Sequence, residues 1–225
     1  MNKAFAFILA IVSISCQGTP KPITDEMVAE IKPVVSHQPA EAPGTDNLKL
    51  ETAIFAGGCF WCTEAFFKEL KGVQTVTSGY IGGTKANPTY REVCTGTTGH
   101  AEAIKITFDP AQIAYEDLLQ VFFETHDPTT LNRQGNDTGT QYRSEIFYMS
   151  EAQKKAAENF IKLLTDQKIY SDKVVTKISK ATTFYEAEEY HQDYYALNKS
   201  QPYCQMVIAP KLAKLKKNYQ SKLKG

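Results

Sequence analysis

The sequence predicts an α+β fold, a two-layer sandwich with a split β-α-β core, long polar loops and a C-terminal extension. Strand and helix patterns follow one another in the order strand, helix, strand, strand, helix, strand, with further elements at the C-terminal end. Long polar stretches at 82–99 and 126–141 interrupt this order. Of the 225 residues, 42% are hydrophobic, enough for one sizeable core. A ferredoxin-like arrangement of the sheet is therefore expected.

Residues that end regular structure mark the element boundaries. They are Gly57-Gly58 after the first strand, Gly72 after the first helix, Pro110 after the third strand and Ser150 as a helix N-cap. The expected elements are a strand at 50–55, a helix at 59–70, strands at 73–80 and 103–108, a helix at 115–125, a strand at 145–148, a helix at 151–167, a strand at 174–178 and a helix at 186–197.

The charge pattern argues against a nucleic-acid partner. Lys and Arg number 25 and so do Asp and Glu, which leaves no basic excess to neutralise phosphates. Six lysines and no acidic residue lie between Lys211 and Gly225, where Leu212, Leu215 and Tyr219 recur at helical spacing. One apolar stripe normally docks on its own domain, so we expect an amphipathic tail helix.

The N-terminus has the pattern of an export signal. Lys3 precedes an apolar run at 4–14 that is shorter than the ~20 residues a bilayer crossing needs. The run ends at Cys16, in a segment that resembles the cleavage box of bacterial lipoproteins, although Ser13 replaces the usual aliphatic residue. We therefore expect export to the bacterial cell envelope or periplasm, with lipidation of Cys16 and a lipid anchor in the membrane. A soluble exported protein and an uncleaved anchor remain alternatives.

The chain is expected to divide into three parts. Residues 1–15 are expected to be a lipoprotein-like signal peptide. Residues 16–47, with five prolines, are expected to be a flexible spacer with a short helical turn near 26–31. Residues 48–225 are expected to form the folded domain with its C-terminal tail.

Cys59 is one of five cysteines and the one in the most unusual setting. It follows Gly57-Gly58 and falls at the first turn of the predicted helix, where free N–H groups and the helix dipole favour negative charge. A thiol in that position ionises more easily, and the thiolate is the reactive species. Phe60 and Trp61 follow it and are expected to wall a small apolar pocket beside the sulfur.

Two other functions are compatible with the cysteines alone. Cys59 and Cys62 form a C-x-x-C, which would be the redox pair of a thiol–disulfide oxidoreductase. In an exported binding domain the cysteines would instead form structural disulfides. A metal site is not expected, because no second pair of ligands has zinc spacing.

The sequence resembles the A-type peptide methionine sulfoxide reductases, which act on the S epimer, from about Glu51 to Cys204. The matching segments are Gly58-Cys59-Phe60-Trp61 with Glu64, Gly79-Tyr80, Gly82-Gly83, residues 87–94 and 98–103, residues 126–144, and the later positions Glu188, Tyr190, His191, Gln192 and Tyr194. So many ordered segments are specific, which a lone C-x-x-C is not.

The resemblance implies a role for each site residue. Cys59 would attack the sulfoxide sulfur as a thiolate, and Glu102 would donate a proton to the oxygen, which requires a raised carboxyl pKa. The other implied residues are Tyr90, Tyr142 and Asp137, which bind and polarise the oxygen, and Phe60 and Trp61, which hold the methyl group. Glu64, His100 and His191 are expected to support the structure.

The resemblance also implies how the enzyme is regenerated. The sulfenic acid left on Cys59 would condense with a second thiol. Cys204 matches the resolving cysteine of the family and is favoured, while Cys62 competes with it or acts in relay. No bound cofactor is implied; the reductant would be a thioredoxin-like protein, which outside the cytoplasm means a periplasmic thioredoxin-fold partner. The substrates would be oxidised proteins or free methionine sulfoxide.

Overall fold

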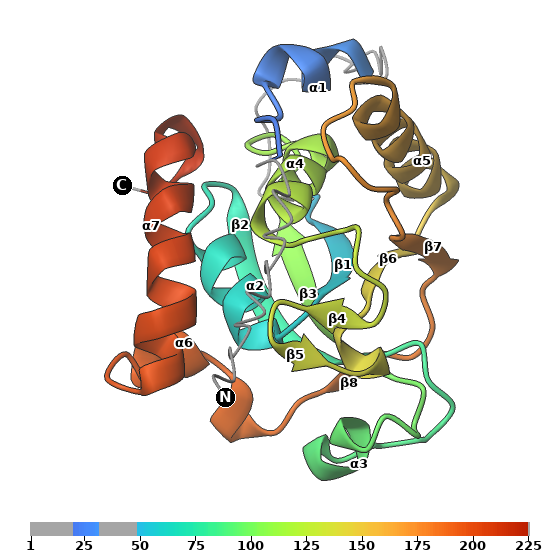
Figure 1. Ribbon diagram of the computed structural model, residues 1–225, viewed down its shortest axis with the longest axis vertical. Helices are drawn as coiled ribbons and strands as arrows, with labels where there is room; N and C mark the ends of the chain where they lie inside the picture. Colours follow the sequence, from blue (N-terminus) through green and yellow to red (C-terminus); the bar gives the residue numbers. More distant parts are fainter. Residues whose placement is uncertain (1–19, 32–48, 225) are drawn as a thin grey trace, which may run out of the picture.

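The computed structural model describes residues 20–31 and 49–224. At its centre is a six-stranded sheet (Figure 1). The sheet order is β7-β6-β1-β3-β2-β8. Its strands are β1 (Glu51–Gly57), β2 (Val73–Ile81), β3 (Ala101–Phe108), β6 (Ser144–Tyr148), β7 (Lys177–Lys180) and β8 (Tyr185–Glu186). β3 runs antiparallel to both β1 and β2, β6 runs antiparallel to β1, and β7 runs parallel to β6. The expected signal peptide and Cys16 lie outside the described residues.

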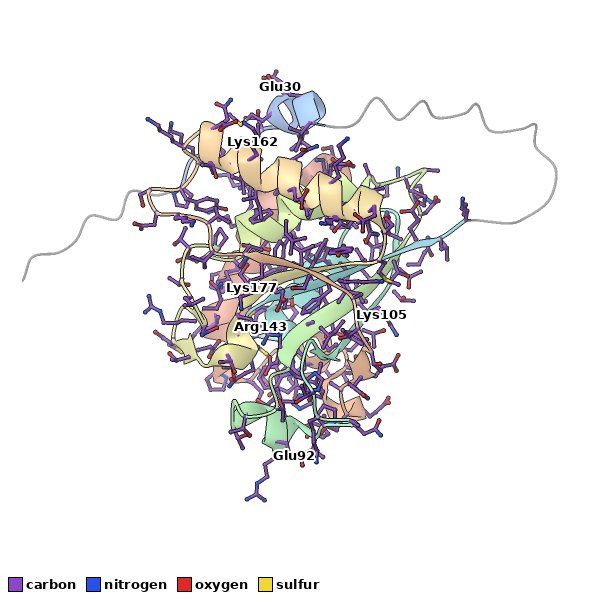
Figure 2. The ribbon with its side chains drawn as sticks, turned by 90° about the vertical axis from the view of Figure 1, so that its right-hand side faces the viewer. Glu30, Glu92, Lys105, Arg143, Lys162 and Lys177 are labelled. Atoms are coloured by element: carbon purple, nitrogen blue, oxygen red, sulfur yellow. The ribbon has the colours of Figure 1, made fainter. Side chains whose placement is uncertain are left out.

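Helices cover one face of this sheet. They are α2 (Phe60–Lys68), α4 (Tyr115–Thr125) and α5 (Glu151–Asp166), and Figure 2 shows α4 and α5 along the same side of the strands. Phe55, Ile104 and Ile106 of the sheet join Phe122 and Phe160 of these helices in the main core. The opposite face holds a smaller cluster with Ala181 and Phe184 against it. The predicted α+β class is confirmed as a mixed sheet covered by helices.

The N-terminal segment is part of the domain. Helix α1 (Asp25–Ile31) rests against α5 (Figure 2), and Ile23 and Val28 are buried in the main core. The Ile23 N–H donates to Glu124 Oε1 at 2.8 Å, and Gln120 Nε2 donates to the Ile23 carbonyl at 2.8 Å. The prediction of a flexible spacer is therefore wrong for residues 20–31, because two apolar side chains there bury against α4 and α5.

The C-terminus also docks on the domain. Helix α7 (Ala209–Asn218) lies beside α2 (Figure 1) and buries Leu212 and Leu215, as predicted for an amphipathic tail. In the following 3-10 turn, η4 (Gln220–Lys222), Lys222 Nζ donates to Asp25 Oδ1 at 2.8 Å, Asp117 Oδ1 at 3.0 Å and Gln120 Oε1 at 2.8 Å. One half-buried ammonium thus joins both ends of the described chain to α4.

The predicted helix at 186–197 is wrong. In its place are β8, a 3-10 turn η2 (Glu189–His191) and a short α6 (Tyr194–Leu197). At the edge of β2, the Ala187 N–H donates to the Ser78 carbonyl, and the side-chain Oε1 of Gln192 accepts from the Ser78 N–H. The segment therefore bonds to Ser78 of β2 through both its backbone and a side chain. These bonds replace the helical ones.

Three smaller differences affect the loops and one strand. β7 begins three residues later than predicted, because the Val175 N–H donates to the Pro128 carbonyl and not to β6. The polar loops contain α3 (Tyr90–Cys94), β4 (Arg133–Gln134), β5 (Asp137–Thr138) and η1 (Thr140–Tyr142), and a π-helical turn η3 (Cys204–Ile208) precedes α7. Within the described ranges, none of the helices combines the length and apolar character that a bilayer crossing demands.

Candidate active site

A strand–turn–helix connection places Cys59 at the start of α2, as predicted. Gly58 has φ +93°, and a Cβ there would lie 2.5 Å from Gln134 Cγ, so both the backbone conformation and the space require glycine. Cys59 is the N-cap residue, and its carbonyl accepts from the Cys62 N–H at 3.1 Å. The sulfur therefore lies where the chain leaves the sheet.

Glu102 faces this helix start from β3. Its side chain is 1% exposed, and its Oε2 accepts from the Phe60 N–H at 3.1 Å. Burial, and then the charge of Cys59, raise the pKa of Glu102 well above its ordinary value. A carboxyl group whose protonated form is favoured by burial thus lies next to Cys59.

Tyr90 and Tyr142 lie near the same carboxyl group. Tyr90 is the first residue of α3, whose N-cap Thr89 forms a capping box with Glu92. Its N–H donates to Glu188 Oε1 at 2.8 Å. Burial, followed by the charge of Glu102, raises the pKa of both phenols, so they remain O–H donors. Two phenolic O–H groups thus lie within reach of the charge of Glu102, and that of Tyr90 is also hydrogen-bonded to Cys94.

Phe60 and Trp61 form the aromatic part of the site. Phe60 is buried, with ring centroids 5.8 Å from Tyr80 and 6.4 Å from Tyr90. Trp61 is half-buried and stacks on Tyr194 at 3.7 Å, and its Nε1–H donates to His191 Nδ1 at 3.1 Å. The indole is fixed on both its face and its edge.

The residues expected to support the structure do so. His191 accepts the Trp61 bond, and the His100 Nδ1 accepts from the Gly83 N–H at 3.1 Å. Glu64 is buried; its Oε1 accepts from the Asp193 N–H at 3.0 Å and pairs with Lys68 at 3.1 Å. Each of these side chains holds a loop against α2 or β2.

The two thiols of the C-x-x-C share one hydrogen bond and respond in opposite directions. The pKa of Cys59 is raised well above its ordinary value, first by the hydrogen bond with Cys62 and then by burial. The Trp61 N–H at the helix start lowers the Cys59 pKa but is outweighed. The pKa of Cys62 is lowered, first by the bond from Cys59, with a further contribution from the charge of Lys211. The predicted effect of the helix start on Cys59 is thus present, while the hydrogen bond between the two thiols decides how they share the proton.

A cavity of about 380 Å³ opens beside these thiols. Cys59, which is 9% exposed, lines it together with Cys62, Asp137, Tyr203 and Lys211. The Tyr203 O–H donates to Asp137 Oδ2 at 2.9 Å, and Tyr203 Oη lies 3.9 Å from Cys62 Sγ. Asp137 is thus engaged by Tyr203 in the cavity, and its charge also reaches Glu102 and Tyr142.

Two sets of residues therefore meet at Cys59. We name them the Glu102 group, which consists of Glu102, Tyr90, Tyr142, Phe60 and Trp61, and the Cys62 group, which consists of Cys62, Asp137, Tyr203 and Lys211. The members of the Glu102 group do not line the cavity of the Cys62 group.

The other two described cysteines differ from this pair. Cys204 is fully buried in η3, and burial raises its pKa, with a further increase from the charge of Cys59. Cys94 is an exposed free thiol on α3. The thiol of Cys204 is enclosed in this structure. Its resolving role stays a prediction.

Comparison with known proteins decides the family. Residues 51–223 match the profile of the family described as peptide methionine sulfoxide reductase. The chain is a member of this family. It is 58% identical over 174 residues to peptide methionine sulfoxide reductase MsrA of Deinococcus radiodurans, a match that covers 77% of this chain and 84% of that one. The corresponding protein of Sulfolobus acidocaldarius is 57% identical over 173 residues, which are 77% and 97% of the two chains.

Solved structures of the same family also resemble this fold. Reduced Mxr1 from Saccharomyces cerevisiae superimposes with a TM-score of 0.64 at 33% identity, covering 72% of this chain and 92% of the other. Methionine sulfoxide reductase A of Corynebacterium diphtheriae gives 0.59 at 36% identity, covering 66% and 75%. The protein is thus a peptide-methionine (S)-S-oxide reductase, an oxidoreductase that acts on methionine sulfoxide.

Several residues of this reductase site received no role from the sequence. Tyr203 could have been noticed as the neighbour of Cys204, and Glu188 as a position shared with the family. Lys211 had no signal of its own, because it is one of six lysines in the tail. In the described part of the chain, no three His, Cys, Asp or Glu side chains are grouped as metal ligands would be.

Proposed function

We propose that the protein reduces methionine-S-sulfoxide, free or in proteins, through a sulfenic acid on Cys59 and then a disulfide. The observation that carries this mechanism is the position of Glu102, which is buried, bonded to the Phe60 N–H at 3.1 Å and next to Cys59, where burial raises its pKa. Because that bond occupies Oε2, the other carboxyl oxygen is left to carry the donated proton. An acid and a thiolate can then act on the two atoms of one S=O bond.

The first step balances as follows. Cys59 passes its proton to Cys62 across the hydrogen bond that the two thiols share, and the resulting Cys59 thiolate attacks the sulfoxide sulfur while Glu102 protonates the oxygen. The S–O bond of the substrate breaks and the oxygen ends on Cys59, which yields methionine and a Cys59 sulfenic acid. Tyr90 and Tyr142 are neutral donors that can bind the oxygen as charge develops on it. Asp137 assists through its charge, and Phe60 and Trp61 contact the substrate methyl group.

We propose that the second step is disulfide formation with release of water. Cys62 is already hydrogen-bonded to Cys59 and would form the first disulfide with it. Cys204 would then take over that disulfide by thiol–disulfide exchange when η3 opens. Each turnover then oxidises two thiols, so two electrons must return from a dithiol. A thioredoxin-like protein has that chemistry. The protein itself needs no bound cofactor for these steps.

The fold beneath this site is proposed to be a split β-α-β, ferredoxin-like core. The order of β6, β1, β3 and β2 supports it, as do the antiparallel pairings of β3 with both neighbours and of β6 with β1. Helices α2 and α4 are then the two crossovers. This arrangement brings the end of β1 and the start of β3 together, where Cys59 and Glu102 lie.

We further propose export. Residues 1–15 would be removed as a signal peptide and Cys16 would carry lipid, which places the domain in the bacterial cell envelope. Support comes from Lys3, the apolar run at 4–14 and the small residues before Cys16. A periplasmic thioredoxin-fold protein would then be the reductant. Mass spectrometry of the mature N-terminus tests this proposal, and an unmodified Cys16 in a full-length chain would refute it.

The reaction is tested with methionine-S-sulfoxide and dithiothreitol, with methionine measured by chromatography. We expect Cys59→Ser to form no methionine, because a hydroxyl at that position is not a thiolate nucleophile. The control is Ser171→Ala, which changes an exposed hydroxyl outside the cavity of the two thiols and should keep turnover. Equal rates for wild type and Cys59→Ser would end the proposal.

A further inference from the structure

The hydroxyl of Tyr203 lies between a thiol and a carboxylate. It donates to Asp137 Oδ2 at 2.9 Å and lies 3.9 Å from Cys62 Sγ. A phenol has a single proton, so while that proton points to Asp137 the Cys62 S–H is the only donor for the other contact. The three groups thus form a short chain along which a proton can leave Cys62.

Tyr203 is held in this place from two sides. Its ring packs edge-on against Trp61, with centroids 5.9 Å apart, and the residue leads directly into the π-helical turn η3. Burial and the neighbouring thiols raise the pKa of Tyr203, so it passes a proton on without remaining a phenolate. In this arrangement the Tyr203 hydroxyl relays the proton, and the Asp137 carboxylate accepts it.

Lys211 supplies a positive charge to the same cavity. It lies on α7, at the mouth formed with Asp137, Tyr203 and Cys62. Its charge favours the ionised form of Cys62, whereas Asp137 opposes it. The groups that face Cys62 are therefore Cys59, Tyr203, Lys211 and Asp137.

We propose that Tyr203 and Lys211 activate Cys62 as the thiol that closes the first disulfide on Cys59. Tyr203 transfers the Cys62 proton to Asp137, and Lys211 is a positioning residue that stabilises the resulting thiolate. This inference rests on the proposed sulfenic acid mechanism and adds the residues that drive its second step. It assigns the C-terminal region to resolution and the Glu102 group to reduction.

The step balances in atoms and electrons. The Cys62 S–H bond breaks and its proton passes through the Tyr203 hydroxyl to the Asp137 carboxylate. The Cys62 thiolate attacks the Cys59 sulfur, an S–S bond forms, and the S–O bond of the sulfenic acid breaks. The departing oxygen takes a proton from solvent, or from Glu102 once solvent has reprotonated it, and leaves as water. Cys62 is oxidised and the sulfenic sulfur is reduced.

A single-turnover experiment on the full chain separates the two steps. Reduced enzyme carrying Cys204→Ser, which leaves Cys62 as the adjacent resolving thiol, is mixed with methionine-S-sulfoxide without reductant. Quenched samples are assayed for methionine and, by mass spectrometry with dimedone trapping, for the sulfenic acid and the Cys59–Cys62 disulfide. The readout is the rate of disulfide formation divided by the rate of methionine formation.

We expect Tyr203→Phe and Lys211→Met each to lower this ratio about tenfold, the size expected for one hydrogen bond to a charged group. For Lys211→Met, the pH profile of disulfide formation should move to higher pH, and Lys211→Arg should restore it. The matched control is Lys214→Met, one turn further along α7, which lines the neighbouring cavity and not that of Cys62.

Three results would overturn the inference. One is an unchanged ratio and pH profile in both Tyr203→Phe and Lys211→Met. Another is an equal loss in Lys214→Met, and a third is the absence of a Cys59–Cys62 bond in the Cys204→Ser enzyme. A failure of the sulfenic acid mechanism would look different, because methionine would then form with no dimedone-trapped sulfenic acid on Cys59 even in an enzyme that carries both Cys62→Ser and Cys204→Ser.

Discussion

The two sets of residues that meet at Cys59 control protons in opposite ways. In the Glu102 group, a carboxyl group is enclosed in the sheet, and burial keeps its proton in place. In the Cys62 group, a thiol lies beside a cavity, where a hydrogen bond from Cys59 and the charge of Lys211 favour losing the proton. Burial therefore favours the protonated form of Glu102, whereas a hydrogen bond and a nearby charge favour the ionised form of Cys62.

The construction of the two groups differs as well. Glu102 stands directly opposite Tyr80 in the register of β2 and β3, among the longest strands of the sheet. Tyr203 and Lys211 come from the C-terminal turn and helix that pack over α2. The rigid position of Glu102 suits the attack on the substrate. Disulfide exchange depends on access, so it suits residues such as Tyr203 and Lys211 that belong to the C-terminal segment.

The largest effect is expected from Glu102→Gln. Removing the proton donor should lower kcat/KM about 10²- to 10⁴-fold, the usual range for general acid catalysis. The first-turnover yield of methionine in the presence of dithiothreitol checks this. Glu158→Gln, on the exposed side of α5, is the matched control and should retain activity. A Glu102→Gln enzyme with wild-type turnover would remove Glu102 from the mechanism.

The same variant should change the dependence of stability on pH. The folded-state pKa of Glu102 is raised, so the folded protein binds this proton more tightly than the unfolded chain does. Its contribution to stability is present below the unfolded pKa and declines as pH rises through the folded one. Thermal melts should therefore show Glu102→Gln gaining stability relative to wild type from acidic to alkaline pH. Wild-type kcat/KM should fall over that alkaline range, and the variant should lose this falling limb.

Trp61→Leu is expected to raise KM about tenfold or more. The change removes an indole that stacks on Tyr194 and donates to His191, and such contacts contribute about 1–3 kcal/mol together. Steady-state kinetics with methionine-S-sulfoxide measures KM and kcat separately. Trp61→Phe keeps an aromatic face and loses only the N–H, so its KM should lie between the two. A change confined to kcat would mean that Trp61 does not bind the substrate.

The smallest effect should come from Lys222→Met, far from both groups. The ammonium is 18% exposed and has three partners, so its loss should cost about 1–2 kcal/mol of unfolding free energy. Lys162→Met removes an exposed pair with Asp166 and should cost less than about 0.5 kcal/mol. Chemical denaturation measures both, and turnover should remain unchanged. Lost activity in Lys222→Met would couple the chain ends to the site.

The sequence predicts the centre of the domain well, because its signals are local. Gly57-Gly58 demand a turn, and Ser150 accepts from the Gln153 N–H as an N-cap. The placement of Cys59 follows from those glycines alone. The role of Glu102 required the family resemblance, since a carboxylate beside a strand is usually solvated.

The remainder depends on contacts between distant residues. Glu188 spans from the Tyr80 hydroxyl to the Tyr90 amide, which no helical periodicity at 186–197 could indicate. The pKa of Cys62 is lowered first by the hydrogen bond from Cys59 and also by the charge of Lys211, which lies 149 positions later in the sequence and is placed there by the docking of α7. Ile23 and Val28 lie five positions apart, which is not the spacing of one helical stripe, so the sequence alone did not indicate that both are buried.

The contact between Asp25 and Lys222 spans 197 positions. A polypeptide that emerges from the ribosome with its N-terminal end first must wait for Lys222 before this closure can form. The slow, entropically costly meeting of two such distant segments comes late in folding. Until then α1 lacks this link to the C-terminal turn and rests on its contacts with α4 and α5.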